Sequence, residues 1–149
     1  MSLHSPLRSL LLSWSEVTSL LTLNPNSNDY PIRPERLHQT DKLPAIEIAI
    51  PNEDLENDLQ GKQIASMATV VISCISTDFA QAEAIATAIL TRNTNPSTGL
   101  KGFQGTAGTI NLDGCNVTNI VRGYAKLPDG SDSGEYVVEI HVEIWTRFP

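Results

Sequence analysis

The chain has 149 residues, of which 40% are hydrophobic and 18% are charged, and its formal net charge is −7. This length suits one domain, residues 1–149, which can bury roughly 70% of its unfolded surface without staples. The negative field repels phosphate, so the sequence argues against a basic clamp for nucleic acid. Two cysteines are too few for a disulfide framework or a structural zinc site. No apolar run reaches the roughly 20 residues that span a bilayer.

The N-terminal segment has the apolar periodicity of a helix. Ser5 and Pro6 suit the N-cap and the first helical position. Ser15 can cap a second short helix that begins at Glu16. The alternative, an amphipathic membrane helix, would need more basic residues on its polar face than Arg8. Apolar residues at helical spacing predict one buried stripe, made of Leu7, Leu10, Leu11, Trp14, Val17 and Leu21.

The next elements are predicted to be strands. A turn at residues 24–29 leads into an extended stretch, and residues 43–50 form the first strand. Pro51 ends this strand. Residues 64–76 are apolar on both faces, which indicates a central strand or one that contacts another subunit. Residues 52–62 between them predict a loop or a hairpin arm with four acidic residues close together, Glu53, Asp54, Glu56 and Asp58.

A helix is predicted from residue 78 to about Arg92, and Thr77 or Asp78 is its N-cap. Its buried stripe is predicted to contain Phe79, Ala82, Ala86 and Ile89. Residues 93–108 then predict a mobile, glycine-rich surface loop, because glycine loses the most backbone entropy on ordering. Within the apolar run of the preceding strand, we expect Cys74 to behave as a small buried hydrophobe.

The C-terminal third predicts three strands, at residues 109–112, 116–126 and 135–147, with a turn at 128–130. The last strand alternates between apolar residues from Val138 to Ile144 and polar residues from Glu139 to Arg147. Short turns between consecutive strands favour antiparallel pairing. We therefore predict an α+β fold: an antiparallel sheet of about five strands, with the alanine-rich helix and the N-terminal helices packed on one face.

Residues that could carry chemistry are few. Glu139, His141 and Glu143 share one face of the last strand at a spacing that could bind a metal, but no fourth ligand is near in sequence. No Gly-x-Ser-x-Gly elbow activates a serine, and the glycine loop follows a helix, whereas a phosphate-binding loop follows a strand. We expect no metal site, no cofactor and no enzymatic activity.

The order of these segments resembles the tail-completion or tail-terminator proteins of long-tailed bacteriophages over almost the whole chain. A leucine-rich helix leads to an extended stretch at residues 30–34 and then to a strand begun by Leu43-Pro44. A Leu-x-Gly turn follows at residues 59–61, and the next strand runs into the alanine-rich helix. The chain closes with a strand from Gly134 to Trp145.

This resemblance implies a non-enzymatic subunit of an oligomeric ring, often a hexamer, which caps the tail tube, stops its growth and joins it to the head connector. DNA would pass without specific binding, and no membrane would be involved. The protein would be made in the bacterial host cytoplasm and reside in the virion tail. The alternative is a small ferredoxin-like binding module or enzyme with a ligand or metal site near Glu139, His141 and Glu143. We expect the assembly contacts at Glu53, Asp54, Glu56, Asp58, Lys101, Phe103 and Trp145.

Overall fold

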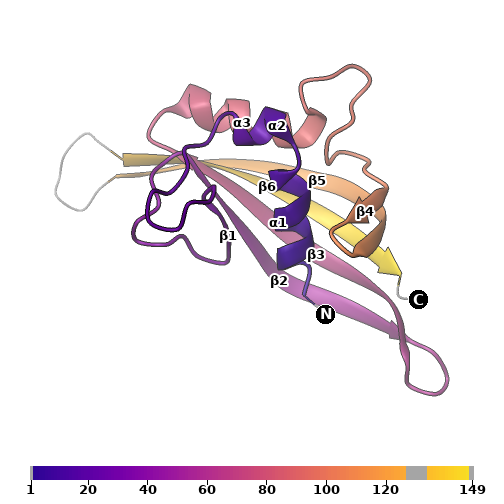
Figure 1. Ribbon diagram of the computed structural model, residues 1–149. Coiled ribbons are helices and arrows are strands. Elements are labelled where there is room, and N and C mark those ends of the chain that lie inside the picture. Colours follow the sequence, from indigo (N-terminus) through magenta and orange to yellow (C-terminus); the bar gives the residue numbers. More distant parts are fainter. Residues whose placement is uncertain (1, 127–133, 148–149) are drawn as a thin grey trace.

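The computed structural model describes residues 2–126 and 134–147, and the turn predicted at 128–130 lies outside these ranges. The strand order in its single sheet is β1-β2-β3-β6-β5-β4 (Figure 1). β1 runs parallel to β2, and every other neighbouring pair is antiparallel. In chain order the elements are α1 (His4–Leu12), α2 (Ser15–Thr18), β1 (Ile32–Pro34), β2 (Ala45–Asn57), β3 (Gln63–Ser76), α3 (Phe79–Thr91), β4 (Gly105–Ala107), β5 (Ile110–Lys126) and β6 (Gly134–Arg147).

The α+β class is confirmed, but the prediction of about five antiparallel strands is wrong. The described residues form six strands in a mixed sheet. The parallel strand β1 was missed because it is three residues long and ends in Pro34, a residue typical of sheet edges. β5 is one strand where two were predicted. A register shift between Leu112 and Gly114 lets it continue through the polar break.

The acidic segment is mostly a strand rather than a loop. Glu53, Asp54 and Glu56 pair with β3, and a register shift after Ala49 accommodates Pro51. The turn is confined to residues 58–62. The hairpin-arm alternative is therefore confirmed, and the β2–β3 hairpin projects beyond the rest of the sheet (Figure 1).

The helices cover one face of the sheet, and the core lies between them (Figure 1). α1 packs on β1 and β2, and α3 packs on β3 and β6. Every residue of the predicted N-terminal stripe is buried, and so is Cys74. Ala82, Ala86 and Ile89 of α3 are also buried, but Phe79 is 46% exposed. Phe79 was misassigned to the buried stripe, because it packs edge-on against Tyr136 at the margin of the sheet.

The helix ends agree only in part with the sequence. α1 begins at His4 after Leu3, and no side chain caps it, so the prediction of Ser5 as N-cap is wrong. The second short helix is confirmed, although its N-cap residue is Trp14. Asp78 caps α3 by accepting a hydrogen bond from the backbone N–H of Ala80 at 3.1 Å. No helix in the described ranges is long and apolar enough to cross a membrane.

The uncovered face of the sheet consists of the side chains that alternate with the core. In β6 it includes Glu139, His141, Glu143 and Trp145, while the intervening residues are buried. In β3 the half-buried Met67 and Val71 lie on the same face, opposite Trp145 and His141. We call this surface the open face.

Candidate functional site

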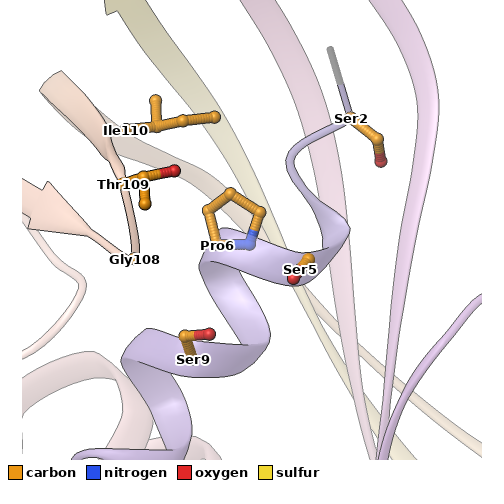
Figure 2. Close-up of a pocket in the computed structure, with 7 residues that line it drawn as sticks. All are labelled: Ser2, Ser5, Pro6, Ser9, Gly108, Thr109 and Ile110. Atoms are coloured by element: carbon orange, nitrogen blue, oxygen red, sulfur yellow. The ribbon is translucent and has the colours of Figure 1, made fainter.

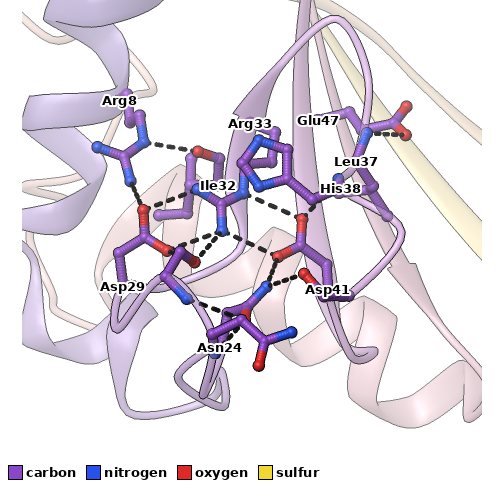
Figure 3. Close-up of polar contacts among 12 residues, drawn as sticks. Arg8, Asn24, Asp29, Ile32, Arg33, Leu37, His38, Asp41 and Glu47 are labelled. Carbon is purple, nitrogen blue, oxygen red and sulfur yellow. Dashed lines mark hydrogen bonds and ion pairs between the residues drawn. The ribbon is translucent and has the colours of Figure 1, made fainter.

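A partly buried polar network holds the long connection before β2 in place (Figure 3). Arg33 of β1 donates to Asp29 from Nη1 at 2.7 Å and from Nη2 at 2.8 Å. It donates to Asp41 from Nε at 3.0 Å and from Nη2 at 2.9 Å. Arg8 of α1 donates to Asp29 at 3.0 Å and to the carbonyl of Ile32 at 2.7 Å. The network therefore joins α1, β1 and the connection.

Both carboxylates of the network keep their charge down to strongly acidic pH. Burial by itself would raise the pKa of Asp41, but hydrogen bonds from Arg33, the Asn24 amide and the His38 backbone N–H outweigh it and hold the pKa at about 2. The pKa of Asp29 is well below its ordinary value because Arg33 and Ser27 donate to it. Paired and hydrogen-bonded charges of this kind serve the fold.

The three candidate metal ligands of β6 do lie on the open face. His141 Nε2 is 3.0 Å from Glu139 Oε2. Across the sheet, Glu143 lies opposite Thr69 and Asn116, which add no carboxylate, thiol or imidazole. The part of the chain that the structure describes holds no group of three or more His, Cys, Asp or Glu placed to bind a metal. The structure therefore adds no ligand to this row.

Four of the predicted interface residues lie on the β2–β3 hairpin. The register places Glu53 on the same side as the helices and Asp54 and Glu56 on the open face. Asp58 has a structural role in the turn, where its Oδ1 accepts the backbone N–H groups of Gln60 and Lys62, each at 2.9 Å. Glu53, Asp54 and Glu56 thus extend from the paired strand, whereas Asp58 also holds the turn.

The structure brings Trp145 close to this hairpin. Trp145 is 44% exposed on the open face, opposite Met67 and Gly114. A cavity of about 330 Å³ lies beside it, lined by residues that include Glu56, Ile64 and Arg147. Exposed aromatic residues of this kind are typical anchors of protein contacts.

The other two predicted interface residues lie on the glycine-rich segment. Phe103 packs edge-on against the buried Trp14 at a centroid distance of 6.1 Å, so it is partly buried against the core. Leu100 is fully buried, and its N–H donates to the carbonyl of Ile89 at 2.8 Å. This part of the segment is thus anchored to the end of α3. Lys101 is exposed and lines a cavity along β5.

A cavity of about 310 Å³ lies between α1 and the turn before β5 (Figure 2). Hydroxyl groups of Ser5, Ser9 and Thr109 surround it, together with Pro6 and Ile110. The residues that line it include no titratable side chain, so the cavity offers no acid or base.

Sequence reasoning missed the two edges of the sheet. β1 pairs with β2 only over residues 46–48, and Glu35 satisfies the backbone of Ile48 and Ile50 beyond it. β4 pairs with β5 only over residues 110–112, and Gly102 donates to the carbonyl of Cys115. In the described ranges, residues 52–57 of β2 and 116–126 of β5 have no strand on their outer side. No sequence signal revealed this, because edge position depends on long-range pairing.

The site and fold thus define an α+β protein with a mixed sheet, one open face and two free edge segments. No family model matches the sequence, and no curated protein matches it. The fold is similar to a chain of a solved structure described as the virion of a native gene transfer agent (GTA) particle, with a TM-score of 0.51 and 15% identity. The likeness covers 94% of this chain and 98% of that chain. At this identity it shows a shared fold.

Proposed function

We propose that the protein is a structural component of a phage-like virion. The observation that carries this proposal is the extent of the fold likeness, which takes in 94% of this chain and 98% of a chain from a gene transfer agent virion. The resemblance of the segment order to tail-completion proteins points to the same class.

Within the virion, the protein is a ring-forming tail subunit that caps the tail tube, ends tail growth and joins the tail to the head connector. It acts without catalysis or cofactor, after synthesis in the bacterial host cytoplasm. The support is a surface suited to contacts, because the strands of the hairpin arm expose Leu55 and Ile64. Exposed apolar residues grouped on one projection are typical of interaction sites.

The open face favours passage of DNA without binding. Glu47 and Glu139 both lie opposite Ser73, one on each side of it, and Glu143 lies further along β6. If this face lines the bore of the ring, its carboxylates repel the phosphates of passing DNA. The chain's net charge of −7 acts in the same direction.

Deleting the gene in the phage or prophage that encodes it tests this function. We expect heads and tails that fail to join and tails of irregular length, seen by electron microscopy and restored by the intact gene in trans. Mass spectrometry of purified particles should find the protein in the virion. Normal particles from the deletion strain, or particles that lack the protein, would refute the proposal.

A further inference from the structure

We infer that neighbouring copies of this chain join edge to edge, the free segment of β2 in one copy pairing antiparallel with the free segment of β5 in the next. By free segments we mean residues 52–57 and 116–126, which have no strand paired on their outer side in the described ranges. The inference rests on the proposed function in that it assumes a self-assembling subunit. It adds the surfaces, the strand direction and the residues of the contact.

Strand direction permits this pairing. β2 is antiparallel to β3, β3 to β6 and β6 to β5, so β5 runs opposite to β2. A second copy placed beside β5 in the same orientation presents its β2 antiparallel to it. The joined sheet would then continue in the antiparallel manner from one copy into the next.

The two free segments lie on opposite sides of one row across the sheet. Asn52, Thr69, Glu143 and Asn116 form this row, one from each of β2, β3, β6 and β5. The free part of β2 runs away from the row toward the hairpin turn, and the free part of β5 runs the other way. The edges therefore meet only if neighbouring copies are displaced along the strands.

A closed ring accommodates this displacement when its strands tilt. In a β-barrel, register stagger between strands and tilt against the barrel axis are linked, with tilts of typically about 35–45°. β1 covers one end of β2, and β4 covers the opposite end of β5. The uncovered segments of neighbouring copies are therefore offset along the strands, which is the stagger that a closed ring requires. A head-to-tail contact of this kind closes into a ring or continues as a filament.

A hydrophobic residue and a cavity match across the contact. Leu55 lies opposite the buried Ser66, so it is on the helix-covered side of the sheet, yet it is 54% exposed because no helix of the described ranges reaches the arm. The cavity along β5 has a volume of about 400 Å³ and is lined by Leu90, Val117 and Ile120 among others. Val117 and Ile120 lie opposite buried residues of β6, so the cavity is on that same side.

Charge also matches. The free segment of β2 carries Glu53, Asp54 and Glu56, whereas residues 116–125 of β5 include no acidic residue. Lys101 lines the same cavity, whereas Arg122 of the β5 segment is already paired with Glu83 of α3. Acidic side chains on an exposed edge discourage pairing with an identical edge, and here they favour an edge that lacks acidic residues and has Lys101 beside it.

Sedimentation velocity of the purified chain over a concentration series, with Leu55→Asp and Leu59→Asp, tests the inference. Leu59 is the matched control, because it is the same residue on the same hairpin but lies in the turn, fully exposed and outside the paired segment. We expect L55D to weaken association by at least about tenfold and L59D to leave it unchanged. Circular dichroism melts should be alike for all three chains.

A cross-linking experiment gives a second readout that does not depend on the loss of a property. A Leu55→Cys chain mixed with a Val117→Cys chain should form a disulfide-linked dimer on oxidation, and a Leu59→Cys chain with the same partner should form far less. The native Cys74 and Cys115 are buried, and burial raises the pKa of both thiols, so they compete little.

Normal association of L55D, equal cross-linking at positions 55 and 59, or a chain monomeric at every concentration would overturn the inference. A deletion strain with unaffected particles would instead refute the virion role and leave the edge contact standing.

Discussion

Arg33 and Asp41 form a buried ion pair, with Nη2 and Oδ1 2.9 Å apart and their side chains 5% and 0% exposed. Asp29 on the other side of the guanidinium is a second carboxylate, and Arg8 also pairs with it, so two arginines balance two aspartates. Because every partner is hydrogen-bonded, removing one leaves an uncompensated buried charge. Breaking such a pair costs far more than losing a surface ion pair.

We predict that Asp41→Asn lowers the free energy of unfolding by about 3 kcal/mol, because Arg33 loses a charged partner inside the protein. Urea denaturation of the variant and the unmodified chain measures this. Asp54→Asn is the control, since Asp54 is an exposed residue of β2, and its effect should be close to zero. Equal effects of the two substitutions would contradict the structural role of the network.

The same pair predicts an acid dependence. The pKa of Asp41 is about 2 in the folded chain, against about 3.9 for an unfolded aspartate. A lowered folded pKa gives a stabilisation that is complete above about pH 4 and is lost as the pH falls through about 2. Asp29 acts in the same direction. Melting temperatures between pH 5 and pH 2 should therefore fall less steeply in D41N.

We predict that Gly99→Ala destabilises the chain by about 1–3 kcal/mol. A Cβ at this position would lie 2.5 Å from the backbone carbonyl carbon and oxygen of Leu90, in the last turn of α3. Gly114→Ala is the matched control, because a Cβ there meets nothing within 4 Å. Thermal melts of both variants measure the difference. Equal melting temperatures would show that the segment around Gly99 does not pack on α3 as described.

The sequence predicted the elements that local periodicity determines. The stripe from Leu7 to Leu21 and the alternation of β6 are properties of neighbouring residues, and both are confirmed. The strand character of Glu53–Asn57 was predicted only as one of two alternatives, because acidic residues have low strand propensity, and pairing with β3 overrides it. Short β1 and β4 depend on long-range pairing alone. The candidate contact residues were predicted where a charge or an aromatic side chain stands out in the sequence, as at Trp145. The two free edge segments could be recognised only once the pairing of the strands was known.

We predict no tight zinc site at Glu139, His141 and Glu143, because the described neighbours supply no further ligand. Calorimetric titration with zinc should give a dissociation constant no tighter than millimolar, which is about −4 kcal/mol. His141→Ala is the control, and it should titrate like the unmodified chain. A stoichiometric micromolar site abolished by that substitution would favour a metal-linked binding module.

The acidic strand residues are predicted to act in assembly rather than in folding. Replacing Asp54 and Glu56 by Ser should leave the melting temperature nearly unchanged, because exposed charges contribute little. The same chain should give fewer finished tails in a complementation assay. Asp58→Ser, in contrast, should lower the melting temperature, because it removes the acceptor of two hydrogen bonds in the turn. A full yield of tails with the Asp54 and Glu56 double variant would show that these two carboxylates are not needed for assembly and serve only solubility.

The two tryptophans provide the last prediction, because one lies in the core and the other on the open face. Trp14 is 4% exposed, packs against Phe103 and lies under Arg92 at 5.4 Å, so Trp14→Ala should cost about 3–5 kcal/mol in unfolding free energy. Trp145 is 44% exposed, so Trp145→Ala should change stability little. In complementation, however, W145A should sharply reduce joined particles, since exposed aromatics carry much of the binding energy of protein interfaces. Denaturation and particle counts on the same two variants separate the roles, and normal particle numbers with W145A would remove Trp145 from the assembly contact.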